Sequence, residues 1–122
     1  MKILLACVLV FACVGPSLAI PPSPAGQYRC HGTQGGETYH IALVVTVYRE
    51  GFRFDWKSTA EAQPMQVGLS VLRGNQMAVA IMSARGDLAV GLYTYTPGRL
   101  DGVWSWDGRR ETETCVTGVA DA

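Results

Sequence analysis

The chain has 122 residues, with ten basic and ten acidic side chains and a formal net charge of zero. A chain of this length predicts one small domain, and without a basic stripe it is not expected to bind nucleic acid or an anionic membrane. It has only two histidines and none of the motifs of serine hydrolases or zinc peptidases, so we expect no catalysis, no cofactor and no metal site.

Residues 1–19 have the pattern of a secretory signal peptide. Lys2 precedes an apolar run at 3–14, and the small-residue pattern Ser17-Leu18-Ala19 follows it. The run is too short to span a bilayer, and no later stretch approaches the ~20 apolar residues that a spanning helix needs. We therefore predict an exported protein, periplasmic or secreted, that is cleaved before Ile20. Lipid attachment at Cys7 or Cys13 is the less favoured alternative.

A proline-rich lead-in at 20–25 separates the signal peptide from the expected domain at 26–119. Proline fixes φ and has no backbone N–H for a strand ladder, so the first strand is expected to begin near Gly26. From there apolar and polar residues alternate. Phe52, Phe54 and Trp56 share one face of a run, for example, and charged residues occupy the other face.

The alternation predicts antiparallel sheet with almost no helix. Glycine, proline, asparagine or aspartate stand between the runs, where tight turns need them. We expect about eight strands, near 26–32, 38–49, 52–58, 64–72, 76–84, 88–96, 99–106 and 111–117. Short connections favour an up-and-down meander that closes into a small barrel. A β-sandwich is the alternative, and only residues 59–64 could supply the long connection that it needs.

Two cysteines remain after the signal peptide, Cys30 near the start of the domain and Cys115 near its end. An even pair in an exported chain predicts one disulfide. Closure of a barrel would bring the first and last strands side by side, which is where this bridge would lie.

Four aromatic residues are candidates for either the core or a ligand pocket. Phe54 and Trp56 share one face of a predicted strand, and Trp104 and Trp106 share one face of another. Indole rings can line a pocket in a small barrel, but eight short strands leave an interior about wide enough for their own side chains. Both interpretations stay open from the sequence.

The tripeptide Arg85-Gly86-Asp87 lies at a predicted hairpin tip. It matches the motif through which several extracellular ligands bind integrins, so it is a candidate interaction loop, but it is also ordinary turn chemistry. Glu113 is a second candidate, because it lies on a late strand near Arg109 and Arg110. It is expected to be an inward acid paired with arginine or the start of a polar site.

The C-terminal half has a more specific pattern. Leu92-Tyr93, the run Gly98-Arg99-Leu100-Asp101-Gly102-Val103-Trp104-Ser105 and then Thr112-Glu113 occur in order. This pattern resembles a family of small exported bacterial proteins that are often labelled fibronectin-binding. Further matches cover residues 26–115 and include Tyr28, Gly32, Gly36, Tyr39, Trp56 and Gly68-Leu69. Glu111 stands where the family has glycine, and the cysteine pair is an addition. The resemblance implies a β-barrel that contacts another protein.

A weaker similarity involves both ends of the domain. Tyr28-Arg29-Cys30-His31-Gly32 at the start and Cys115 at the end are similar to periplasmic inhibitors of C-type lysozyme, which are small barrels with end-to-end disulfides.

These observations predict an exported, monomeric binding module that contacts a matrix or envelope protein and has no catalytic activity. Two alternatives remain. One is an inhibitor of lysozyme, and the other is a carrier of a small apolar ligand held between Trp56, Trp104 and their neighbours.

Overall fold

The computed structural model describes residues 23–58 and 65–117. The predicted signal peptide, residues 20–22 of the lead-in and the segment 59–64 lie outside the described residues, as do residues 118–122. Among the described residues no helix is long and apolar enough to cross a membrane.

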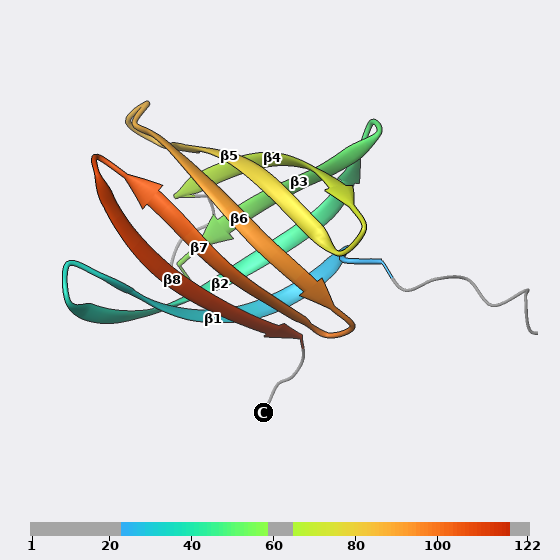
Figure 1. Cartoon of the computed structure of the whole chain (residues 1–122), viewed down its shortest axis with the longest axis horizontal. Helices are drawn as coiled ribbons and strands as arrows, with labels where there is room; N and C mark the ends of the chain where they lie inside the picture. Colours follow the sequence, from blue (N-terminus) through green and yellow to red (C-terminus); the bar gives the residue numbers. More distant parts are fainter. Residues whose placement is uncertain (1–22, 59–64, 118–122) are drawn as a thin grey trace, which may run out of the picture.

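Eight antiparallel strands form a closed barrel in sequence order, with β1 paired to β8 (Figure 1). The strands are β1 (Gly26–Gln34), β2 (Glu37–Tyr48), β3 (Gly51–Lys57), β4 (Gln66–Arg73), β5 (Gln76–Ser83), β6 (Leu88–Thr96), β7 (Arg99–Trp106) and β8 (Arg109–Thr117). The predicted meander and its closure are confirmed, and the sandwich alternative is wrong because one continuous ladder joins all eight strands.

The strands extend further into some turns than the sequence pattern indicated. β1 continues to Gln34 and β8 begins at Arg109, and each flanks a two-residue turn. At Asp107-Gly108 both residues have positive φ, 53° and 79°, which matches the right-handed twist of the flanking strands. Gly35-Gly36 has φ of 62° and 86° and closes the first hairpin in the same way. Such tight turns let the ladder continue to the turn itself.

Alternate connections meet at opposite ends of the barrel. The turns β2–β3, β4–β5 and β6–β7 lie at one end, which we call the packed end, at the right of Figure 1. Here Pro24 is fully buried, and its carbonyl oxygen accepts a hydrogen bond of 2.7 Å from the Tyr28 hydroxyl. The Tyr95 hydroxyl donates to the Ser23 carbonyl at 3.0 Å. Residues from the predicted lead-in thus pack onto the barrel.

The other end, which we call the cavity end, carries the hairpins β1–β2, β5–β6 and β7–β8 and the β3–β4 connection. The core lies between the two ends. Phe54 and Trp56 belong to it, and the Phe54 ring centroid lies 5.4 Å from that of Trp56 and 5.8 Å from that of Tyr93. Trp104 packs against this core but is only half-buried.

Candidate functional site

One row of register partners crosses five neighbouring strands of the barrel. In this row Tyr93 on β6 pairs with Gly102 on β7, Gly102 pairs with Glu113 on β8, Glu113 pairs with Gly32 on β1, and Gly32 pairs with Tyr39 on β2. Glu113 therefore has a glycine on each side and a tyrosine beyond each glycine. All five residues are at inward positions of their strands, so the row lines the interior.

The two glycines make room for the two tyrosine rings. A Cβ atom at Gly102 would overlap the ring of Tyr93, and a Cβ at Gly32 would lie 2.7 Å from the Tyr39 hydroxyl. Gly68 has the same role beside Trp56, whose ring carbon Cζ3 would lie 3.1 Å from an added Cβ. Glycine at these positions allows each aromatic ring to lie flat across the neighbouring strand and reach toward Glu113.

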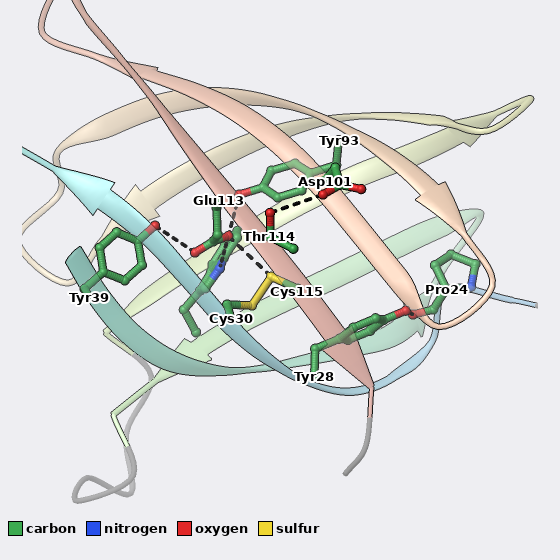
Figure 2. Close-up of a disulfide and its surroundings, with 10 residues drawn as sticks. Pro24, Tyr28, Cys30, Tyr39, Tyr93, Asp101, Glu113, Thr114 and Cys115 are labelled. Atoms are coloured by element: carbon green, nitrogen blue, oxygen red, sulfur yellow. Dashed lines mark hydrogen bonds between the residues drawn. A yellow bond between two sulfur atoms is a disulfide. The ribbon is translucent and has the colours of Figure 1, made fainter. Parts of the chain in front are cut away.

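The Glu113 carboxylate accepts three hydrogen bonds inside the barrel (Figure 2). The Tyr93 hydroxyl donates to Oε1 at 2.7 Å, and the Trp56 indole N–H donates to the same oxygen at 3.1 Å. The Tyr39 hydroxyl donates to Oε2 at 2.9 Å. Glu113 is 4% exposed, so this is a buried acid held by three uncharged donors.

Burial and hydrogen bonding act on the Glu113 pKa in opposite directions. Loss of water raises the pKa above its usual range, and the hydrogen bonds from Tyr93, Tyr39 and Trp56 partly offset that rise. Burial and the adjacent Glu113 charge in turn raise the pKa of both tyrosines. The tyrosine hydroxyls consequently keep their protons and remain donors.

Glu113 is the inward acid that the sequence suggested, but it has no arginine partner in the described part of the chain. Arg109 and Arg110 are exposed at the start of β8. Glu111, one inward position earlier, instead accepts from the Thr33 hydroxyl at 3.0 Å and from the Gly35 N–H at 3.1 Å. Arg110 occupies an outward position, and Arg109, although it shares the face of Glu113, lies four residues away at the exposed end of β8.

The predicted disulfide joins Cys30 to Cys115 directly beneath Glu113 (Figure 2). The two residues are register partners on β1 and β8, with their Cα atoms 3.9 Å apart. The Cys115 sulfur lies 3.7 Å from Glu113 Oε1. Because the two sulfur atoms are bonded to each other, Cys30, Cys115 and Glu113 do not form a metal site in the oxidised chain. His31 beside them is exposed.

Above Glu113 the barrel opens into a cavity of about 400 Å³ at the cavity end. Five aromatic side chains line it, namely Tyr39, Trp56, Tyr93, Trp104 and Trp106. Ile41, Ile81 and Ala89 add apolar wall, and Glu113 is the buried acid among the lining residues. The four aromatic residues singled out from the sequence thus fall into different groups. Trp56 belongs to core and cavity alike, Trp104 and Trp106 are half-buried cavity walls, and Phe54 is core only.

The candidate interaction loop lies at the mouth of this cavity, because Arg85 and Asp87 also line it. Ser83 Oγ accepts from the N–H groups of Arg85 and Asp87, at 3.2 and 3.1 Å, and Gly86 has a φ of 94°. The Arg85 guanidinium lies 3.8 Å from the Asp87 carboxylate, with the two side chains 85% and 47% exposed. The loop is an ordered turn, and an adhesive role for it stays a prediction.

No protein-family model matches this chain, and a search of curated proteins finds no match to it. The family resemblances drawn from the sequence therefore stay predictions.

Sequence reasoning did not connect Tyr39 and Tyr93 with Glu113. The available signal was glycine at inward positions of otherwise regular strands, at Gly32 and Gly102. Such a glycine often marks a close approach by a large neighbour. Only the strand register identifies which ring fills the space.

Proposed function

We propose that this protein binds a small organic molecule in the cavity at one end of its barrel and catalyses no reaction. The main support for this proposal is a cavity of about 400 Å³ with five aromatic side chains in its lining and one buried carboxylate among them. Known ligand pockets have this volume and this combination of apolar wall with few polar groups. The proposal favours the carrier alternative over the protein-binding expectation as the primary role.

The rigidity of the site supports the proposal. Tyr39, Tyr93 and Trp56 are each fixed at one edge by a hydrogen bond to Glu113. Two of these rings also lie over glycines on neighbouring strands that leave them little freedom to move, Tyr93 over Gly102 and Tyr39 over Gly32. A pocket whose walls are already ordered loses less side-chain entropy when a ligand enters, so affinity is gained.

A fluorescent probe can test whether the cavity is occupied by ligands. N-phenyl-1-naphthylamine is a neutral apolar dye that becomes bright in dry surroundings, and we expect saturable binding of one molecule per chain. Ala89→Trp places an indole in the cavity and should abolish that binding. The matched control is Val90→Trp on the outward face of the same strand, which should leave it unchanged. Binding that survives Ala89→Trp would place the dye outside the cavity and contradict the proposal.

Export is part of the proposal. The disulfide between Cys30 and Cys115 supports an oxidising compartment, because such bonds rarely persist in the cytosol. The signal-like residues 1–19 support the same conclusion from the sequence. Expression of the full chain in a bacterium, followed by N-terminal sequencing of the periplasmic fraction, should give Ile20 as the first residue.

A second candidate function, contact with another protein, is favoured by the outer surface. The outward positions of β4 to β7 carry large apolar side chains that are 42–68% exposed: Leu69, Val71, Met82, Leu88, Val90, Leu92 and Val103. The strand register makes them contiguous. Leu69 and Val90 both flank Ala80, for instance, and Leu92 pairs with Val103. We call this surface the apolar wall.

The remaining outer surface differs in character. β1 and β3 present charged groups outward, including Arg29 and the ion pair of Arg53 with Asp55 at 3.1 Å. A contiguous apolar patch on one side of a small domain is typical of a protein-binding site. We propose that the apolar wall contacts a matrix protein of the fibronectin type, as the sequence resemblance suggested.

Interferometry on immobilised fibronectin tests this second function. We expect saturable binding that falls at least about tenfold in Val90→Lys, because a charge would lie unpaired within the buried patch. Gln27→Lys on the outward face of β1 is the matched control and should bind as the wild type does. Binding to C-type lysozyme instead would favour the inhibitor alternative. If light scattering shows that the wild type is a dimer and that Val90→Lys is a monomer, the apolar wall would be a self-association surface.

A further inference from the structure

The charge inside the cavity suggests which class of molecule it holds. Besides the imidazole of His40, the lining contains three charged residues, Arg85, Asp87 and Glu113. Arg85 and Asp87 lie at the mouth and pair with each other at 3.8 Å. Glu113 forms none of the ion pairs found among residues 23–58 and 65–117, although it is the most buried of the three. The cavity therefore carries one unbalanced negative group.

The donors around Glu113 stabilise a carboxylate without neutralising it. The Trp56 indole N–H can only donate, and it points at Oε1 together with the Tyr93 hydroxyl. Oε2 accepts a single hydrogen bond from a side-chain oxygen or nitrogen, that of Tyr39. Since each carboxylate oxygen can accept about two hydrogen bonds, Oε2 retains one acceptor position beside Tyr39, another cavity residue.

The walls above this acceptor are suited to a positive charge with an apolar body. The aromatic residues Trp104 and Trp106 line the cavity together with Tyr39. The face of an aromatic ring attracts a cation, most strongly for tryptophan and where water is excluded. Ile41, Ile81 and Ala89 would contact carbon atoms of the same ligand.

We propose that the cavity binds a protonated organic amine, with its ammonium group at Glu113 Oε2 and its apolar body against Trp104 and Trp106. This inference rests on the proposed small-molecule function and specifies its ligand class. A bound ammonium ion supplies the counter-charge that Glu113 lacks, so binding pairs a buried charge in a low-dielectric site. An anionic molecule of the same shape would be repelled.

Displacement of N-phenyl-1-naphthylamine by three molecules of similar shape tests the inference. The probes are 2-phenylethylamine, 2-phenylethanol and 3-phenylpropionate, which are cationic, neutral and anionic at neutral pH. We expect the amine to displace the dye at a concentration about tenfold lower than the alcohol needs. The carboxylate should need a higher concentration than either. Equal displacement by amine and alcohol, or preference for the carboxylate, would overturn the inference.

Glu113→Gln should bring the amine and the alcohol to similar affinities, because the amide keeps one acceptor oxygen but has no charge. Glu111→Gln is the matched control, at the preceding inward position of β8 and outside the cavity lining, and should keep the amine preference. If Glu113→Gln fails to fold, the three-probe comparison on the wild type still decides the question.

The two proposals fail in different ways. If the dye binds and Ala89→Trp abolishes its binding, but displacement shows no preference for the amine, the small-molecule function stands and the ligand class is wrong. If the dye does not bind in the cavity and none of the three probes gives a calorimetric signal, both are wrong.

Discussion

The packed end and the cavity end of the barrel are formed by the same eight strands, but their interiors differ. Toward the packed end the inward positions carry Val45, Met77 and Leu100, which are at most 1% exposed, and Pro24 is also fully buried at this end. Toward the cavity end the inward positions alternate between glycines, such as Gly32 and Gly102, and large rings that leave space between them. The packed end is therefore filled by apolar side chains that stabilise the fold, whereas the cavity end keeps the space in which we propose that a ligand binds.

This division follows from side-chain volume in a barrel of fixed width. Eight strands enclose an interior that medium-sized side chains can fill. Replacing an inward side chain by glycine removes volume locally, and a ring from the next strand occupies part of the space. At Gly102 the Tyr93 ring does so and places its hydroxyl on Glu113, so the space that remains becomes a cavity with a polar group in its lining.

The largest effect should come from truncating a packed ring. Phe54 is 0% exposed and contacts both Trp56 and Tyr93, so Phe54→Ala should lower the free energy of unfolding by about 3–5 kcal/mol. Urea unfolding followed by tryptophan fluorescence measures it. A loss below about 1 kcal/mol would mean that the packed interior does not dominate stability.

A smaller loss is expected when one glycine of the cavity end gains a methyl group. Gly102→Ala should cost about 1–3 kcal/mol, because its Cβ overlaps the Tyr93 ring and forces it away from Glu113. Thermal unfolding gives the stability, and dye binding should weaken in parallel. Ser105→Ala, on the outward face of the same strand, should stay within about 0.5 kcal/mol of the wild type.

Trp104→Ala should distinguish most clearly between the packed end, which affects stability, and the cavity end, which affects ligand binding. The indole is half-buried against the cavity, so its removal is expected to cost about 1–2 kcal/mol, well below the Phe54 change. The free energy of amine binding should fall by a larger fraction than the free energy of unfolding does, because the cavity loses one of its aromatic walls. Urea unfolding and dye displacement on the same sample provide the two numbers. A stability loss as large as that of Phe54→Ala would assign Trp104 to the packed interior.

The smallest effect is a pH dependence of stability from Glu113. Burial raises the Glu113 pKa in the folded state, so the folded chain binds this proton more tightly than the unfolded chain does. The corresponding stability is fully present below the pKa of the unfolded chain, about 4.3, and is lost as pH rises through the higher folded value. Relative to Glu113→Gln, the wild type should lose stability with a slope of at most about 1.4 kcal/mol per pH unit in that window.

Urea unfolding of both proteins from pH 4 to 8 measures this slope. Other groups titrate in the same range, and Asp101, whose pKa is lowered by its hydrogen bond from Arg99, favours folding at higher pH. Both proteins share these groups, so the difference between them isolates Glu113. Parallel curves would mean that Glu113 titrates alike in the folded and unfolded chains.

Much of the architecture was determined by the sequence alone. Period-two alternation and turn residues predicted the strands to within a few residues, because a half-buried antiparallel strand needs that alternation and a tight turn needs residues that accept positive φ. The cysteine count predicted the bridge between Cys30 and Cys115, since closure of the meander makes the first and last strands neighbours. These are local patterns, or follow directly from the topology.

The site was decided by the tertiary structure. Which ring lies over which glycine depends on the register between strands. A shift of one residue would move Glu113 from the inward face of β8 to the outward face and Arg110 from the outward face to the inward one. The sequence predicted either an arginine partner for Glu113 or a polar site, because Arg109 and Arg110 lie only a few residues away in the chain. The barrel instead brings Tyr39, Trp56 and Tyr93 to it from β2, β3 and β6. Only closure of the sheet sets these distant residues around one carboxylate, because β2, β3 and β6 are not neighbours of β8 and their side chains meet Glu113 inside the barrel.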